Sequence, residues 1–301
     1  MTTSRSADMH EGGRVMNQSA GPTPDRDKAE VLAGLRQAIG SIEATSADLV
    51  RAPQPAAKGE DTAPSRRKVR GQYERITYPG MPEGPDWMEH LPARYKDGQR
   101  GFDRRIMEEL AAVGVPCYTL DDLANRVRTI PQGIPIFIDW LTHLEERIPG
   151  EETPHREAIR AGLIRNLNDL AARGNPAAID ALVAQLRRKP PMRSGLVGYA
   201  TEALARIATQ RDFPVIVELI DELQHQGAVK GPLIEYLGKV KTDEARDLAL
   251  RFLDTPSTYF AIRALIQMKA HGVRARIEPY LTHSNALIRK EARRAMERLP
   301  E

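Results

Sequence analysis

Cysteine and aromatic side chains are scarce in this 301-residue chain, which has one cysteine and 5% Phe, Trp and Tyr. A single cysteine excludes an intramolecular disulfide and any metal site built from cysteines alone, and it fits a reducing compartment. Long hydrophobic runs are also missing, because the most apolar stretches, at 133–141 and 213–220, are far shorter than a membrane span. The first 25 residues have no apolar stretch typical of a secretory signal. We therefore expect a cytoplasmic protein without membrane contact.

Neither sign of charge dominates the chain. Its 44 basic and 41 acidic side chains leave a formal net charge of +3. Proteins dedicated to nucleic acids usually concentrate positive charge in a patch or stripe. The densest basic run here is RRKVR at 66–70, which we interpret as a solvated linker. The composition thus disfavours a nucleic acid as the partner.

Motifs that carry chemistry are absent as well. The sequence contains no G-x-x-x-x-G-K-[ST], G-x-G-x-x-G or G-x-S-x-G, so neither a phosphate-binding loop nor a nucleophile elbow is indicated. Asp139 and His143 stand four residues apart, but a metal site needs a third ligand, so we interpret them as an exposed pair. Cys117 has no assigned base and is predicted to be a partly buried, unreactive thiol. We predict no enzyme activity, no catalytic residue, no metal and no cofactor.

One acidic group stands at a turn before a predicted helix and comprises Glu151 and Glu152, with His155 close behind. Negative charge suits the positive end of the helix dipole. We therefore interpret these side chains as capping groups rather than catalytic ones.

The N-terminal third lacks the pattern of a folded core. Residues 1–30 and 51–101 are polar or interrupted by Pro and Gly, so we predict that 1–101 is largely disordered. One amphipathic helix is expected at 29–50, where apolar residues recur every three or four positions. A short helical cap follows at 102–130, in which Thr119 is predicted to cap a helix with Asp122 at its third position.

From residue 131 onward the chain is predicted to be a series of amphipathic helices joined by short turns, with no sheet. The expected helices span 134–148, 154–173, 176–189, 193–209, 213–225, 229–240, 243–253, 257–270, 273–282 and 285–299. They repeat in pairs: residues 235–254 align with 263–282 at an offset of 28, and offsets of 31 and 33 continue the register. A two-helix unit of this length is typical of an α-solenoid.

The last unit carries a family resemblance. The segment 285–299 resembles the second helix of a HEAT repeat, with the apolar–basic pair Ile288–Arg289 at its start and small residues at Ala292 and Ala295. The pairs Val229–Lys230 and Ile159–Arg160 occupy the same place, whereas Ser257–Thr258 and Leu196–Val197 depart from it. Over about 131–299 the chain is similar to bacterial HEAT-like repeats of the phycobilisome-lyase type and to actinobacterial HEAT-repeat proteins of unassigned function.

This resemblance implies a right-handed, HEAT/armadillo-like α-solenoid of about five helix pairs at 131–301. The repeat motif is specific for the fold and says almost nothing about function. Our leading hypothesis is a non-enzymatic scaffold or adaptor that binds another protein on its concave face. Two alternatives stay open: a nucleic-acid-binding protein of the alkylated-base DNA glycosylase type, and a lyase related to the phycobilisome type. The di-iron enzyme deoxyhypusine hydroxylase, which shares the architecture, uses several His-Glu dipeptides, and the only one here is His10–Glu11.

In proteins of this resemblance the second helices line the concave face, which singles out two columns of residues. One column is Arg165, Glu202, Glu235, Arg263 and Arg294, and the next turn adds Asp169, Arg206, Lys239, Gln267 and Arg298. Glu202–Arg206 and Glu235–Lys239 are expected to form i,i+4 ion pairs. Arg263 and Arg294, beside Tyr259 and Lys290, are predicted to stay without a neutralising partner. Arg and Tyr are common energetic anchors at interfaces, so we predict an acidic partner segment at the C-terminal repeats.

Overall fold

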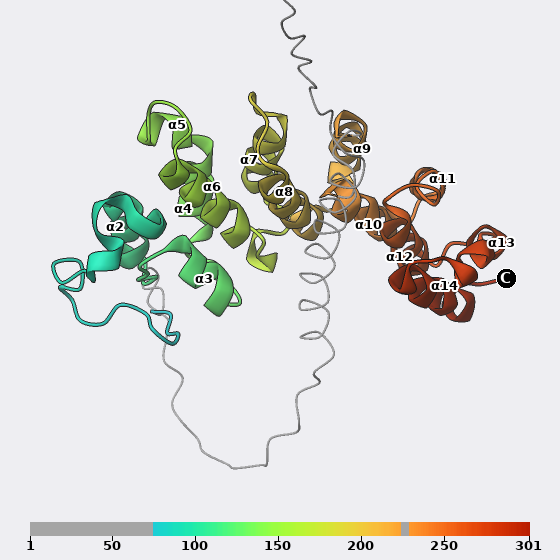
Figure 1. Cartoon of the computed structure of the whole chain (residues 1–301), viewed down its shortest axis with the longest axis horizontal. Coiled ribbons are helices and arrows are strands. Elements are labelled where there is room, and N and C mark those ends of the chain that lie inside the picture. The colour runs from blue at the N-terminus through green and yellow to red at the C-terminus, as the bar shows by residue number, and fades with distance from the viewer. Residues whose placement is uncertain (1–74, 224–228) are drawn as a thin grey trace, which may run out of the picture.

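The computed structural model describes residues 75–223 and 229–301, and every regular element in those two ranges is a helix. The predicted all-helical class is therefore confirmed, with no strand in the ranges just given. The predicted helix at 29–50, the basic run at 66–70 and the predicted disorder of 1–74 lie outside the described residues. Figure 1 shows the helices following one another in an arc from α2 to α14.

The helices have the following bounds: 3-10 helix η1 Ala93–Gly101, α2 Arg104–Ala112, α3 Leu120–Arg126, α4 Ile134–Thr142, α5 Leu144–Arg147, α6 Pro154–Asn166, 3-10 helix η2 Leu170–Ala172, α7 Pro176–Arg187, α8 Ser194–Ile207, 3-10 helix η3 Gln210–Asp212, α9 Phe213–Glu222, α10 Gly231–Val240, α11 Asp243–Leu250, α12 Thr258–Met268, α13 Arg274–Ile277, 3-10 helix η5 Glu278–Thr282 and α14 Ala286–Arg298.

Local sequence explains where these helices begin. The side chains of Thr119, Thr153, Asn175, Thr242 and Asn285 each accept a backbone N–H at the start of α3, α6, α7, α11 and α14. Such caps satisfy amide groups that have no partner within the helix. The predicted Thr119 cap is confirmed by its hydrogen bond from the Asp122 N–H at 3.1 Å.

Three predicted helices are interrupted. The predicted helix 154–173 consists of α6, which ends at Asn166, followed by the 3-10 helix η2. The predicted helix 134–148 is divided into α4 and α5 at His143, whose backbone leaves helical geometry (φ −109°, ψ 22°). The His143 ring lies 2.9 Å from the Asp139 carbonyl oxygen, at the break. The predicted helix 273–282 consists of the short α13 followed by η5, with Pro279 in the 3-10 segment.

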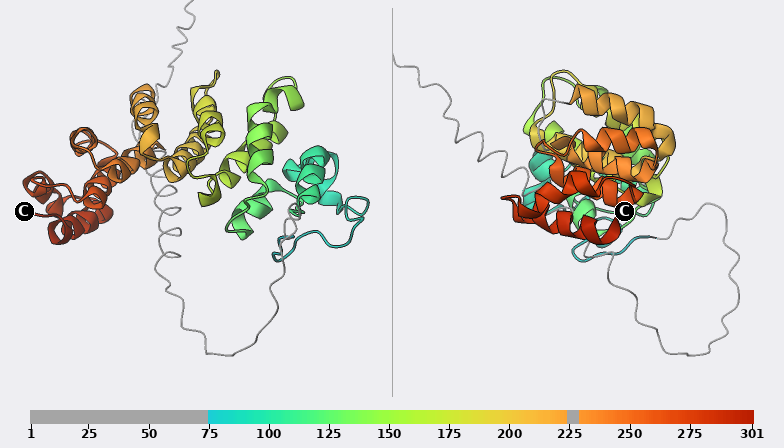
Figure 2. Two further views of the ribbon diagram at one scale, coloured as in Figure 1. Left: turned by 180° about the vertical axis from the view of Figure 1, so that it is seen from behind. Right: turned by 90° about the vertical axis from the view of Figure 1, so that its right-hand side faces the viewer.

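The helices pack as neighbouring pairs. Each of α6, α8, α10, α12 and α14 contacts a helix that precedes it in the chain: α4, α7, α9, α11 and the α13–η5 segment respectively. The second helices also contact one another in sequence, α6 with α8, α8 with α10, α10 with α12, and α12 with α14. We call this series the inner row, because α7, α9 and α11 lie along the opposite, outer side of the arc (Figure 1). Figure 2 shows the same order from behind.

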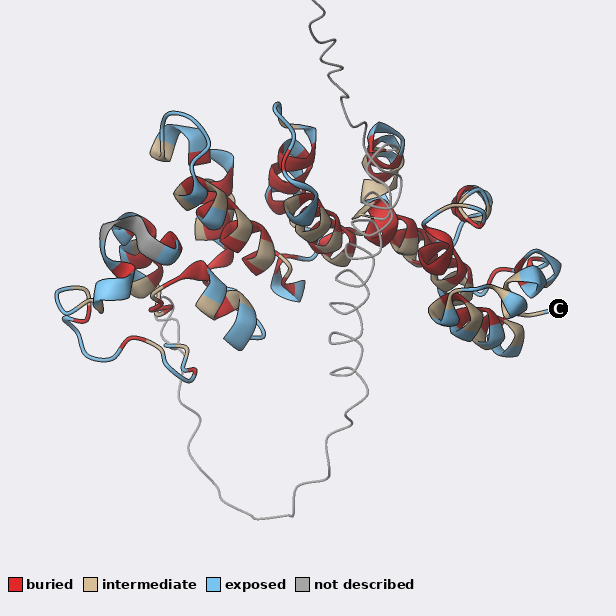
Figure 3. Ribbon diagram, in the orientation of Figure 1, coloured by how far each residue is buried: buried red, intermediate tan, exposed pale blue. Residues whose placement is uncertain are grey.

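Buried side chains run the length of the arc and are densest along α10 and α12 (Figure 3). They also extend into 75–101, which the sequence pattern had suggested was disordered. Tyr78, Trp87 and Tyr95 are each at most 9% exposed, and the Tyr78 hydroxyl donates to the Pro116 carbonyl at 2.9 Å. The prediction of disorder is thus wrong for 75–101, because aromatic burial holds a segment that has no helical periodicity.

No helix in the two described ranges combines the length and the apolar composition needed to cross a membrane.

Candidate functional site

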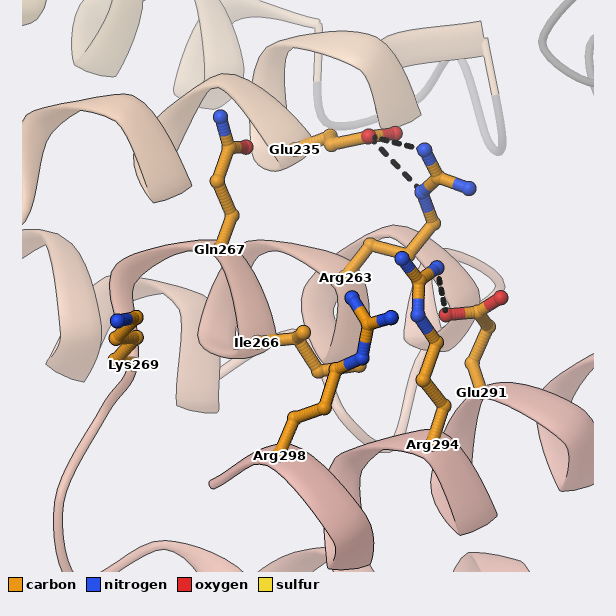
Figure 4. Close-up of a pocket in the computed structure, with 8 residues that line it drawn as sticks. All are labelled: Glu235, Arg263, Ile266, Gln267, Lys269, Glu291, Arg294 and Arg298. Carbon is orange, nitrogen blue, oxygen red and sulfur yellow. Dashed lines mark hydrogen bonds and ion pairs between the residues drawn. The ribbon is translucent and has the colours of Figure 1, made fainter. Parts of the chain in front are cut away.

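The C-terminal part of the inner row encloses a hollow of about 530 Å³ (Figure 4). Its lining comes from α10, α12 and α14 and from the residue that ends α12: Glu235, Arg263, Ile266, Gln267, Lys269, Glu291, Arg294 and Arg298. Five of these belong to the two columns that the repeat register predicted, namely Glu235, Arg263, Gln267, Arg294 and Arg298. The hollow therefore brings together the members of both columns on α10, α12 and α14. Lys239 is the one such member that does not line it.

Arg263 has a carboxylate partner, so the prediction that it stays unneutralised is wrong. Its Nη2 and Nε lie 2.8 Å and 2.9 Å from Glu235 Oε1, on the neighbouring helix. Its Nη1 also donates to the Tyr259 hydroxyl at 3.1 Å. Burial is the largest single effect and disfavours the charged guanidinium, but the charge of Glu235, the Tyr259 hydroxyl and the hydrogen bonds to both together outweigh it and raise the pKa of Arg263. This ion pair joins α10 to α12.

Arg294 is also paired, again in contrast to the prediction. Its Nη1 lies 3.3 Å from Oε2 of Glu291, which is buried one turn earlier on α14. Tyr259 is only 4% exposed and packs edge-on against Phe260, so it offers no exposed anchor. Lys290 is exposed but does not line the hollow.

Two cations in the hollow have no partner. Neither Arg298 nor Lys269 makes a side-chain hydrogen bond or an ion pair within 75–223 and 229–301. Both are exposed. Figure 4 shows Arg298 beside Arg294, whereas Lys269 lies on the other side of Gln267 and Ile266 from the two bonded pairs, Glu235–Arg263 and Glu291–Arg294. The open charge of the hollow thus comes from Arg298 and Lys269.

The middle of the inner row also departs from the predicted pairing, because neither Glu202–Arg206 nor Glu235–Lys239 forms an ion pair. Glu202 instead accepts a hydrogen bond of 3.4 Å from the Asn168 side chain, and burial raises the pKa of its carboxyl. The Lys239 Nζ donates to the main-chain carbonyls of Ala205 and Arg206 at 2.6 Å and 3.1 Å. Lys239 therefore binds the C-terminal end of α8.

A group of three cations surrounds this contact. Burial and the nearby charges of Arg173 and Arg206 together lower the pKa of Lys239 to about 8, whereas the charge of Glu235 opposes them. Among the described residues, Arg173 and Arg206 have no side-chain hydrogen bond or ion pair, and the buried Nε of Arg206 has no acceptor. Positive charge is therefore concentrated where α8 and α10 end.

Lys239 should make stability depend on pH. Because the pKa of Lys239 is lowered from 10.5 to about 8 in the folded chain, the unfolded chain binds more protons at this side chain between these pH values. Stability should therefore rise with pH across that window. Urea unfolding at pH 7.5 and 9.5 should show a larger rise for the wild type than for Lys239→Met. The same rise in both proteins would contradict the assignment.

The N-terminal members of the columns hold α3 and the loop that contains Thr129 and Ile130. Arg165 lies 2.6 Å from Asp121 Oδ1 and stacks on Tyr199, with its guanidinium carbon 5.4 Å from the ring centre. Asp169 is buried and accepts from the Ile130 N–H at 2.6 Å and the Thr129 hydroxyl at 2.9 Å. Neither residue is free to bind a partner.

The acidic turn before α6 behaves differently from the prediction. Thr153 is the cap of α6, whereas Glu152 binds Arg160 and Arg156 on that helix. Arg160 is fully buried and bonds Glu145, Glu152 and Gln185 (Nη1 to Oε1, 2.6 Å). The sequence marked Arg160 only as the basic member of an apolar–basic pair and gave no sign of this network.

The remaining candidates lie in structural contacts. His143 Nδ1 is 3.1 Å from Asp139 Oδ1, and Asp139 also binds Arg147. Cys117 is completely buried, more than predicted, its Sγ lies 3.3 Å from Met107 Sδ, and burial raises the pKa of the thiol. In the part of the chain that the structure describes, no three His, Cys, Asp or Glu side chains are grouped to hold a metal ion.

Comparison with known proteins finds no family model, no curated protein and no solved structure that matches the chain.

Proposed function

We propose that residues 131–301 form a right-handed, HEAT-like α-solenoid of five helix pairs. Two observations support this architecture. Each second helix contacts its own first helix and the second helices next to it. In addition, the basic members of the apolar–basic pairs occupy structural positions: Arg160 is fully buried, Lys230 lies 5.1 Å from the Phe252 ring centre, and Arg289 donates to the carbonyls of His283 and Ser284.

This solenoid acts as a non-enzymatic scaffold that binds another protein along its inner row. The observation that carries the proposal is the placement of cations without partners in and beside the hollow between α10, α12 and α14. Charged groups that no intramolecular partner satisfies favour an oppositely charged ligand. The apolar Ile266 and the exposed amide of Gln267 lie beside these cations, and they suit contacts to a peptide chain.

A protein partner fits these residues better than a nucleic acid. Both tryptophans are buried, Trp87 at 7% and Trp140 at 0% exposure, so neither offers a stacking surface for a base. We therefore rank the DNA glycosylase alternative below the scaffold, and no described residue favours the lyase.

A photo-crosslinking amino acid should test the scaffold directly. We expect a crosslinker at Gln267, on the inner row, to capture one protein in the cells that naturally produce this chain. Crosslinkers at Ala184 on α7 and Arg251 at the end of α11, both exposed, serve as matched controls and should not capture that protein. Capture of the same proteins from all three positions, or none from Gln267, would refute the proposal.

A further inference from the structure

Five cations follow one edge of the inner row. Arg206, Lys239 and Arg298 lie in the last turns of α8, α10 and α14, and Lys269 ends α12. Arg173 follows η2, the short turn after α6. We call these five residues the cation row. The second helices α8, α10, α12 and α14 thus each contribute one positive charge at or near their C-terminal ends, and Arg173 adds one in the turn that follows α6.

Only one member of this row makes a direct contact with the end of a helix. All members at helix C-termini interact favourably with the helix dipole, but that interaction leaves their side chains open to a ligand. Lys239 makes the direct contact, because it donates to carbonyls at the end of α8. The side chains of Arg173, Arg206, Lys269 and Arg298 bond no carbonyl and no carboxylate among the described residues.

None of the neighbouring acids forms an ion pair with a member of the row among the described residues. Glu235 is bound by Arg263 on the facing helix, and Glu291 is buried and bound by Arg294. Glu202 accepts from the neutral Asn168 amide; burial raises the pKa of its carboxyl, and the nearby charge of Arg206 opposes this. The cation row therefore keeps positive charge that a negatively charged ligand can bind.

The spacing of the helices limits the shape of the ligand. The helices α8, α10, α12 and α14 contact one another in sequence, and packed helices lie roughly 8–10 Å apart, so a segment that crosses their C-terminal ends meets a new helix about every 8–10 Å. A polyproline II peptide advances about 3.1 Å per residue and repeats its side-chain direction every three residues, about 9 Å. Acidic residues at every third position of an extended peptide would therefore meet successive cations.

We propose that the cation row binds an extended acidic segment of the partner protein, with a carboxylate at about every third residue. The inference rests on the proposed scaffold function and adds the chemistry of its partner. Arg298 and Lys269 bind carboxylates at the hollow, and Arg206 and Arg173 bind them further along the row. Gln267 is placed between these sites to hydrogen-bond the peptide main chain.

The test measures fluorescence anisotropy of a labelled peptide, four repeats of Glu-Pro-Ala, with the full chain at pH 7 and low salt. The double variant Arg206→Gln/Arg298→Gln should bind at least tenfold more weakly, about 1.4 kcal/mol. The matched control Arg251→Gln/Arg276→Gln, which removes two exposed arginines of α11 and α13, should bind within twofold of wild type. If the first double variant unfolds, Lys269→Gln/Arg298→Gln replaces it, since both of those residues are exposed.

A second peptide tests the spacing. It has the same composition, but its four glutamates are consecutive, and it should bind more weakly than the spaced peptide. Equal binding of the two peptides, or an equal loss in the control variant, would overturn the inference. Tighter binding of a labelled single-stranded oligothymidylate through Arg206 and Arg298 would also overturn it, in favour of a nucleic acid.

The outcome separates the two proposals. If Gln267 crosslinks a partner specifically but the spaced peptide does not bind, the acidic-segment inference fails and the scaffold stands. If the peptide binds through the cation row but Gln267 captures nothing in cells, the scaffold proposal fails instead.

Discussion

Replacing Trp87 with alanine should lower the free energy of unfolding by about 3–5 kcal/mol, the usual cost of truncating a buried tryptophan. Trp87 is 7% exposed and lies in 75–101, outside the helical pairs. Its ring meets Tyr118 edge-on, with 5.4 Å between ring centres, and Tyr118 stacks on Tyr95 at 4.8 Å. Removing the indole would leave a cavity against Tyr118, because these two aromatic rings pack in contact.

Urea unfolding followed by far-ultraviolet circular dichroism would measure this loss. The matched control is Glu83→Ala in the same segment, where the side chain is exposed and a change within about 0.5 kcal/mol is expected. Equal stability of the two variants would show that residues 75–101 do not pack on the rest of the chain.

Residues 75–101 show that apolar periodicity alone does not predict which segments of this chain are ordered. Residues 75–101 contain Pro and Gly at close intervals and no helical period, which is why they were predicted to be disordered. Their order depends on contacts with residues distant in the chain, such as Tyr78 with Pro116 and Trp87 with Tyr118. Periodicity detects only segments whose own regular structure presents an apolar face.

The helices after residue 131 were predictable for the opposite reason. Their apolar residues recur every three or four positions, and most predicted bounds lie within a few residues of the observed helices. The Thr119 cap was predicted because its chemistry is local, requiring only a hydroxyl and an amide three residues later. Apolar periodicity and capping chemistry therefore predict the helices, and the sequence repeat predicts that first and second helices alternate along the chain.

Ion pairing could not be read from one helix. The i,i+4 rule predicted Glu235–Lys239, but Glu235 binds Arg263, which is 28 residues away on the next second helix. Lys239 in turn reaches the carbonyls that end α8. The repeat register predicted Asp169 and Gln267 as the members of the second column on α6 and α12. The cations of the cation row near these helices are instead Arg173 and Lys269, which lie a few residues later in the chain. Neighbouring helices, invisible to a local rule, decide these contacts.

Two glycines set the distance between α10 and α12, and substituting either should have a large effect. A Cβ at Gly231 would lie 2.1 Å from two ring carbons of the fully buried Phe260. A Cβ at Gly238 would lie 2.8 Å from the main-chain oxygen of Ala264 and from atoms of Gln267. These positions are seven residues apart, so they lie on one face of α10 and allow the close approach of α12.

We expect Gly231→Ala to lower the free energy of unfolding by about 3 kcal/mol, at the upper end of the usual overpacking cost, because Phe260 has no space to move. Gly198→Ala on α8 is the matched control: nothing lies within 4 Å of its added Cβ, so it should stabilise the protein by about 1 kcal/mol through helix propensity. Urea unfolding of both variants measures the difference, and a Gly231→Ala protein as stable as Gly198→Ala would contradict a close approach of the two helices.

Gly238→Ala should affect both packing and peptide binding, because its Cβ would press on Gln267 in the hollow. It should therefore weaken binding of the spaced acidic peptide as well as stability, whereas Gly198→Ala should leave binding unchanged.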